Sequence, residues 1–169
     1  MQHILEAVRR EATDIEKEAM IAADAHFLAG WRWGKVHLML GIPSTILAAV
    51  AGVSAFSELP APLTAGVAML VAALSALSTF LSPGDRAGAH RAASTTFSDI
   101  RRAASLLRDV DLPLVKEGDE AAARDLAGYL KELAQRITEA EQHAPPISAT
   151  AKLKAEKRYR QQHMTGEEA

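Results

Sequence analysis

The segment VHLMLGIPSTILAAVAGVSAFS, from Val36 to Ser57, contains no Asp, Glu, Lys or Arg. A second uncharged segment, LPAPLTAGVAMLVAALSALSTFLSPG, runs from Leu59 to Gly84, and the carboxylate of Glu58 lies between the two. An α-helix needs about 20 apolar residues to cross the ~30 Å hydrocarbon core of a bilayer, and each segment is long enough. We therefore predict an all-α fold built on a transmembrane hairpin, with spans at residues 36–57 and 63–82 joined by an external turn at 58–62.

The alternative is a soluble helical bundle with an apolar central hairpin. A helix on the surface of a soluble bundle keeps polar residues on the side that faces water, whereas both segments are apolar around the whole circumference. A chain of 169 residues has too little other material to bury two such helices on every side. We therefore favour the membrane hairpin.

Basic residues flank the spans on one side only. Arg32 and Lys35 precede the first span, Arg86 and Arg91 follow the second, and residues 58–62 contain neither Lys nor Arg. Because basic flanks remain in the cytoplasm, this distribution predicts a multi-pass protein with both termini cytoplasmic.

Two tryptophans alternate with basic residues just before the first span. Tryptophan is enriched at membrane–water interfaces, so we interpret this cluster as a set of interface anchors: Trp31, Arg32, Trp33 and Lys35. The alternative is ordinary core packing of the two tryptophans.

The charged parts of the chain also have helical periodicity. Residues 1–35 predict an N-terminal amphipathic cytoplasmic helix that continues into the first span, and residues 83–144 predict a cytoplasmic helical pair. Pro113 is expected to end the first helix of that pair, because the residue before a proline is biased away from the helical conformation. The apolar stripes of these helices can bury one another in a small bundle or form the seams of an oligomer.

Residues 145–169 form a basic C-terminal tail. Its basic residues are close together, with Glu156 among them: Lys152, Lys154, Lys157, Arg158 and Arg160. The tail is either solvated or a frayed helix, or it attaches to anionic lipid, at ~1 kcal/mol for each basic residue near the surface.

Within the spans, small and hydroxylated residues recur at helical spacing. They allow close packing of helices, and in an oligomer they could line a narrow polar pore. The candidates for packing or pore lining are Ser44, Ala48, Gly52, Ala72, Ser75, Ser78 and Thr79. Two spans cannot enclose a channel, so a pore predicts a homo-oligomer in contact with membrane lipid.

Three residues are candidate hinges. Pro43 removes a backbone donor early in the first span and is either a hinge or a tolerated early-helix proline. Pro83 and Gly84 follow the second span, where they can bend the chain toward the cytoplasm.

Other functions find little support in the composition. The chain has no cysteine, which excludes thiol chemistry, and its net charge of −2 argues against a nucleic-acid partner. The histidines have no metal-ligand spacing, and no phosphate-binding glycine motif is present. We therefore expect no enzymatic activity, no metal and no cofactor, and we interpret His26 and His90 as structural polar contacts facing the same layer.

The layout resembles the SLATT family, the SMODS and SLOG-associating two-transmembrane effectors of prokaryotes. The similarity covers roughly residues 15–142 and lies in ADAHFLAGW before the first span, GIPSTILAAVAG within it and ALSALSTFLSPGDRAGAHRAA leaving the second, with Trp31, Pro83 and His90 among the matching positions. The resemblance implies a pore-forming effector of a conflict, or anti-phage, system in the inner (plasma) membrane. It also implies a trigger from a nucleotide messenger or from a nucleotide-signalling or sensor protein.

The sequence thus predicts an oligomeric membrane pore gated by its cytoplasmic helices. The competing hypothesis is a non-conducting two-span scaffold that recruits a cytoplasmic partner. The scaffold requires only the hairpin and a surface on the cytoplasmic helices, and it has no use for the hydroxyl groups of the second span.

Overall fold

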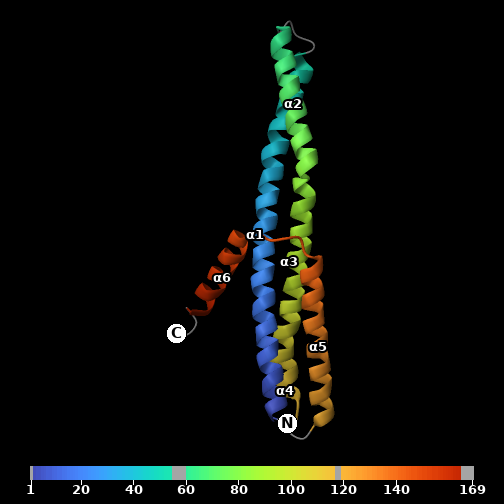
Figure 1. Ribbon diagram of the computed structural model, residues 1–169, viewed down its shortest axis with the longest axis vertical. Coiled ribbons are helices and arrows are strands. Elements are labelled where there is room, and N and C mark those ends of the chain that lie inside the picture. The colour runs from blue at the N-terminus through green and yellow to red at the C-terminus, as the bar shows by residue number, and fades with distance from the viewer. Residues whose placement is uncertain (1, 55–59, 117–118, 165–169) are drawn as a thin grey trace. The chain divides into compact units, whose positions relative to one another are not determined.

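A computed structural model describes residues 2–54, 60–116 and 119–164, and every regular element in these ranges is helical (Figure 1). The elements in chain order are α1 (Gln2–Ser54), α2 (Ala61–Leu81), α3 (Pro83–Leu106), the π-helical turn η1 (Leu107–Asp111), α4 (Leu112–Leu114), α5 (Glu120–His143) and α6 (Ala149–Met164). The all-α prediction is confirmed. The last three residues of the predicted first span and the first two of the predicted external turn lie outside the described residues.

The chain divides into two compact units, and the divisions fall within α1 and α3. Unit 1 contains residues 1–29 and 89–169, and unit 2 contains residues 30–88.

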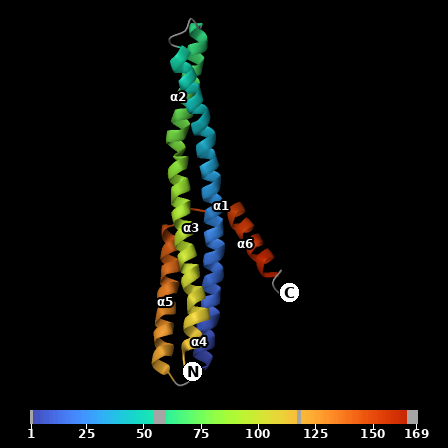
Figure 2. The same ribbon diagram turned by 180° about the vertical axis from the view of Figure 1, so that it is seen from behind.

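The core of unit 1 is formed by α1, α3 and α5, which lie side by side in Figures 1 and 2. Apolar residues at spacings of three and four face inward from each helix, as the sequence periodicity predicts. The fully buried side chains of this cluster include Ala12, Phe97, Ile100, Leu107 and Leu133. Asp119 begins α5 by accepting a hydrogen bond of 2.9 Å from the amide of Ala122, the usual role of an N-cap aspartate.

The end of the helix that starts at Pro83 differs from the prediction. Leu112, the residue before Pro113, is helical (φ −58°, ψ −44°), and the chain continues in helical form to Leu114. The amide of Leu112 donates to the carbonyl of Leu107, five residues back. This wider π-turn relieves the clash of the proline ring with the carbonyl four residues before it, and it places the buried Leu107 and Leu112 on the same side.

The basic tail contains a regular helix, α6, rather than an extended solvated segment. Its Ala151 and Ala155 are each 1% exposed, so one side of the helix is packed. The Nζ atom of Lys17 on α1 lies 5.7 Å from the centre of the Tyr159 ring. The basic side chains Lys152, Lys154, Lys157, Arg158 and Arg160 are exposed or partly exposed.

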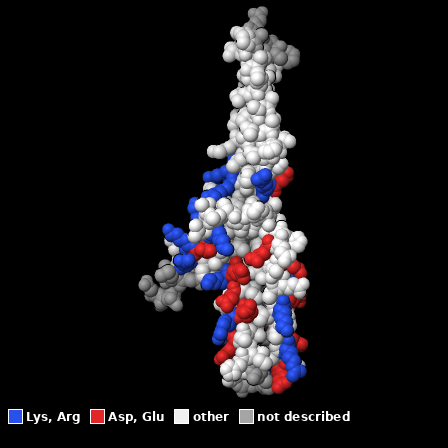
Figure 3. Space-filling view, viewed as in Figure 1, with Lys and Arg blue, Asp and Glu red and all other residues white. Residues whose placement is uncertain are grey.

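Unit 2 contains the C-terminal part of α1 and the whole of α2, which lie side by side (Figures 1 and 2). The most apolar 18-residue window in each of two helical stretches, residues 2–53 and 62–114, is long and apolar enough to cross a membrane, and no residue of either window is buried. The surface of the pair is uncharged from residue 36 to 54 and from 60 to 81, and it is white in Figure 3. By length and composition, each stretch is therefore a candidate membrane span.

Candidate functional site

The structure separates the predicted small and hydroxylated residues into two groups. On α1 a partly buried stripe that includes Leu40, Ser44 and Leu47 faces α2, and on α2 the matching stripe includes Leu74 and Ser78. Ser44 and Ser78 therefore belong to the contact between the two helices. The other candidates are exposed: Ala48, Gly52, Ala72, Ser75 and Thr79.

Hydroxyl groups in unit 2 are bonded mainly to their own helix. Thr79 donates to the carbonyl of Ser75 at 3.0 Å, and Thr45 donates to the carbonyl of Gly41 at 2.9 Å. Such bonds satisfy a hydroxyl where no water is present, while the oxygen retains the capacity to accept a further hydrogen bond. The Oγ atom of Ser44 is the exception among the described residues, because it is buried without a hydrogen-bond partner.

The exposed surface of α2 has two chemically different faces. Ala72, Ser75 and Thr79 recur at spacings of three and four, so they share one face of small residues. Bulky side chains lie on another face, where Met69 is 75% and Phe80 is 85% exposed. The helix thus offers a small, partly polar face and a bulky apolar face.

Each of the two tryptophans carries a cation over its ring. The Nζ atom of Lys35 lies 3.7 Å from the centre of the Trp31 ring, and the guanidinium of Arg86 lies 4.7 Å from that of Trp33. Trp31 is 54% exposed and so is not a core residue. Arg86 belongs to α3, so the contact between Arg86 and Trp33 joins the start of α3 to α1. The fourth predicted anchor, Arg32, also makes an interaction. Cation–π pairs of this kind contribute about 0.5–1 kcal/mol at exposed sites.

The break between α2 and α3 lies at Ser82, beside the predicted hinge. Ser82 has φ 40° and ψ 52°, the left-handed conformation that ends many helices and is usually taken by glycine. Its amide donates to the carbonyl of Ser78 at 3.0 Å, and its carbonyl accepts from the amide of Arg86 at 3.1 Å. Pro83 then begins α3, while a Cβ atom on Gly84 would lie 3.5 Å from the ring of His37. Sequence reasoning missed Ser82 because serine is rare in this conformation.

Pro43 lies inside the continuous helix α1, and both sides of it are helical. Its ring is exposed. No break of the helix accompanies this candidate hinge.

In unit 1, His26 on α1 and His90 on α3 form a buried pair. Their side chains are 1% and 4% exposed, and the two Nδ1 atoms are 3.0 Å apart. His26 also stacks on Phe97, with ring centres 5.5 Å apart and planes inclined by 15°. Nearby, Ser94 donates to the carbonyl of Ala23 at 2.9 Å, so two polar contacts join α1 to α3 here.

Burial lowers the pKa of both histidines, since the charged imidazolium is poorly solvated inside the protein. For His26 the neighbouring His90 adds to this effect, and the pKa falls from 6.5 to about 4. The pKa of His90 is also lowered by burial. The pair is therefore neutral at pH 7.

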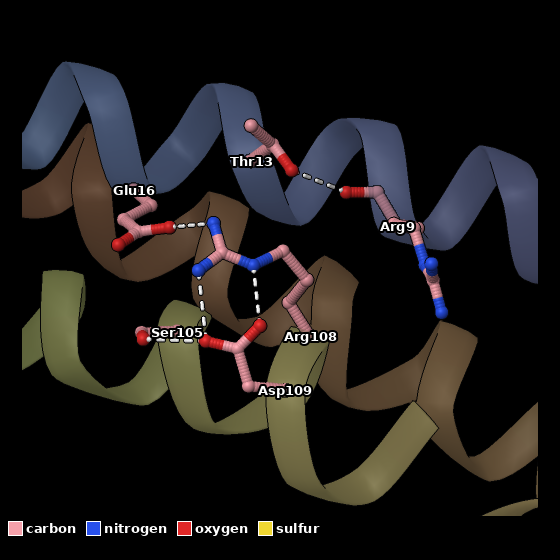
Figure 4. A network of polar contacts seen from close by, with 6 residues as sticks. All are labelled: Arg9, Thr13, Glu16, Ser105, Arg108 and Asp109. Atoms are coloured by element: carbon pink, nitrogen blue, oxygen red, sulfur yellow. Dashed lines mark hydrogen bonds and ion pairs between the residues drawn. The ribbon is translucent and has the colours of Figure 1, made fainter. Parts of the chain in front are cut away.

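A network of ion pairs joins α1 to the π-turn (Figure 4). Arg108 pairs with Glu16 of α1 and binds both carboxylate oxygens of Asp109, at 2.7 and 2.8 Å. Ser105 donates to Asp109 at 3.2 Å. The hydrogen bond from Arg108 holds the pKa of Asp109 below its ordinary value, and the bond to Asp109 raises the pKa of Arg108. These contacts link the π-turn to α1 within unit 1.

A cavity of about 340 Å³ lies beside the histidine pair in unit 1. Apolar and aromatic groups of α1, α3 and the segment after α5 line most of it, with His26 and Phe97 on its wall. Three charged residues also line it: Glu18, Glu141 and Lys152. Among the described residues no group of three or more His, Asp and Glu side chains could hold a metal ion.

A scan against protein-family models, a search of curated proteins and a search of solved structures each find no match for the chain. The chain's own residues and their geometry therefore carry the functional inference.

Proposed function

We propose that the protein is an integral membrane protein whose copies assemble into a regulated pore. The observation that carries this proposal is the exposed apolar surface of unit 2, on which Met39 is 74% and Phe80 is 85% exposed. Contiguous apolar surface of this extent must be covered by lipid or by protein, since water solvates it poorly. Membrane lipid and further copies of the chain are the partners that suit it.

The small face of α2 supports a pore over a purely lipid-facing hairpin. Ala72, Ser75 and Thr79 leave room for close approach, and the hydroxyl oxygens of Ser75 and Thr79 can contact water or ions without the cost of a charged group in the membrane. On α1, Ala48 and Gly52 present a similar small and exposed surface. Several hairpins arranged with these faces inward would enclose a narrow polar path.

The cytoplasmic helices are suited to gate such a pore. The helix α1 is continuous from Gln2 to Ser54, and α3 follows α2 after the single residue Ser82. A rearrangement in unit 1 can therefore reach both membrane helices through the covalent chain. With both termini cytoplasmic, as the basic flanks favour, the signal would arrive from the cytoplasm.

The resemblance to the SLATT family supplies the biological context of the proposal. In that context the protein is an effector of a prokaryotic anti-phage system that permeabilises the inner membrane. Its trigger is a nucleotide messenger or a partner protein that senses one, and the pore itself requires no enzymatic activity and no cofactor.

The test is ion and dye flux from liposomes that contain the purified protein. Ser75→Leu places a bulky apolar side chain on the small face and should abolish flux, with insertion and oligomeric size unchanged. Ala73→Leu is the matched control: Ala73 is an exposed alanine on the bulky side of the same helix, and its replacement should leave flux intact.

A non-conducting scaffold predicts a different result. Flux would be absent from the unmodified protein at every condition tested, including addition of candidate nucleotides and partner proteins. Equal flux through the Ser75→Leu variant and the unmodified protein would instead support a pore but contradict the proposal that Ser75 lines it.

A further inference from the structure

The contact between His26 and His90 places two titratable groups where each depends on the other's protonation state. A hydrogen bond between two Nδ1 atoms requires one ring to donate and the other to accept. The 3.0 Å separation therefore corresponds to a pair with a single proton between the two nitrogens. If both rings become imidazolium ions, both Nδ1 atoms are donors and the contact changes from attractive to repulsive.

Within the described residues, the hydrogen bond that the pair makes is the one between its two Nδ1 atoms. Phe97 stacks on the ring of His26, and the nearby hydroxyl of Ser94 donates its hydrogen bond to the carbonyl of Ala23. The charged and titratable groups that line the adjoining cavities are Glu18 on α1, Glu141 and His143 on α5 and Lys152 on α6. The burial of both rings makes two charges at this place unfavourable.

Protons have a route to the pair. His26 forms part of the wall of the cavity of about 340 Å³, which is partly open, is roomy enough for water and is also lined by Glu18, Glu141 and Lys152. The pair is therefore shielded from bulk solvent but lies next to a space that water can occupy.

We propose that the His26–His90 pair is a proton-binding site that joins α1 to α3 when it is neutral and separates them when both rings are protonated. His26 lies four residues before residue 30, where unit 2 begins in α1, and His90 lies two residues after Gly88, where unit 2 ends in α3. Separation at this position would act on the two helices that lead to the membrane segments. The effect on ion flow rests on the proposed pore, whereas the separation itself does not.

The experiment measures the distance between α1 and α3 in the full-length protein in lipid nanodiscs. The chain has no cysteine, so Phe27→Cys and Arg91→Cys, both at exposed positions, supply two unique sites for spin labels. Acidification from about pH 7.5 to about pH 3 brackets the ordinary histidine pKa of 6.5 and the lowered pKa of His26, which is about 4. The mean distance should lengthen by about 2 Å, the scale of helix shifts in switching proteins, and should return on neutralisation.

Two variants test the assignment to this pair. His26→Asn with His90→Asn retains polar groups near the Nδ1 positions but does not titrate, and it should abolish the pH-dependent lengthening. His3→Asn changes an exposed histidine of the same helix and should leave the lengthening unchanged. A constant distance in the histidine-containing protein, or the same lengthening in the double variant, overturns the proposal.

Ion flux through the same preparations separates this inference from the proposed function. If the distance responds to pH but no flux occurs at any pH, the proton-binding site stands and the pore fails. If flux occurs and the distance is constant, the pore stands and the proton-binding site fails.

Discussion

At His26, burial and the neighbouring His90 both lower the pKa. It is about 4 in the folded protein, compared with 6.5 for a histidine in the unfolded chain. The unfolded chain therefore binds a proton at a higher pH than the folded chain does. The stability that this histidine contributes is fully present above pH 6.5 and is lost as the pH falls toward 4. The difference between these pKa values corresponds to about 3 kcal/mol of unfolding free energy.

The measurement is denaturant unfolding of the detergent-solubilised protein across this range of pH. His26→Asn should reduce the loss of stability between pH 6.5 and 4, and His3→Asn should not. Equal pH dependence in the unmodified protein and in His26→Asn would show that the ring of His26 is free to protonate in the folded state.

The left-handed conformation of Ser82 makes a second prediction at the scale of the residue. Ser82→Gly and Ser82→Ala both remove the hydroxyl that donates to Thr79, but only alanine retains a Cβ atom. Because a Cβ atom costs about 1–2 kcal/mol in this conformation, the glycine variant should be more stable than the alanine variant by about 1 kcal/mol. Thermal unfolding in detergent micelles would measure the difference, and equal midpoints would indicate that the alanine variant adopts another conformation at this break.

At the scale of the helix, the exposed fraction of a side chain does not show whether lipid or water surrounds it. Substitution by a charged residue distinguishes the two environments, because a charge is costly only in lipid. Met69 on α2 and Leu114 on α4 are 75% and 74% exposed. Met69→Arg should reduce membrane insertion, since an arginine near the centre of a span costs about 2.5–3.5 kcal/mol on insertion scales. Leu114→Arg should have little effect, because this position is expected to face water.

The fraction of each variant that resists carbonate extraction from membranes would measure insertion. Loss of extraction resistance in Met69→Arg alone is the expected result. Full solubility of the unmodified protein, with both variants unaffected, would favour the soluble bundle.

The helices themselves could largely be predicted from the sequence, and their ends only in part. The charge-free segments and the stripes of apolar residues have periods that are read directly from the chain, and α5 ends at His143, before Pro145, as predicted. The helical chain ends at Leu114, close to the expected end at Pro113. The conformation of Leu112 was predicted wrongly, because a proline forbids only the ordinary α-helical hydrogen bond and the π-turn supplies a different one. The helix α6 was equally hard to predict, because its buried face consists only of small residues such as Ala151 and Ala155.

The candidate site was predicted as a set of residues but not as a set of contacts. The alternation of Trp31 and Trp33 with cations was visible in the sequence, whereas the pairing of Trp33 with Arg86 requires two segments that are distant in the chain. The same holds for the 3.0 Å contact between His26 and His90. Ser44 and Ser78 could not be separated from the exposed small residues, because that distinction depends on how α1 and α2 face each other.

At the scale of the whole molecule, a substitution at Gly52 tests assembly without disturbing the fold of an isolated copy. A Cβ atom at Gly52 would meet nothing within 4 Å, and the same is true of Gly128 on α5. If copies pack through the small face of α1, Gly52→Leu should reduce the oligomeric mass in detergent, whereas Gly128→Leu should not. Mass measurement by light scattering would decide this, and an unchanged mass for Gly52→Leu would place the interface elsewhere.

The π-turn at residues 107–111 also constrains how this chain can change in evolution. Deletion of one residue there, such as the half-exposed Val110, would restore the spacing of a regular α-helix between Leu107 and Leu112 but would bring back the steric clash of Pro113. Replacement of Pro113 alone would remove the reason for the extra residue without removing the residue. Length and identity at this place are therefore epistatic, and we expect a shortened turn and a non-proline residue at position 113 to be inherited together.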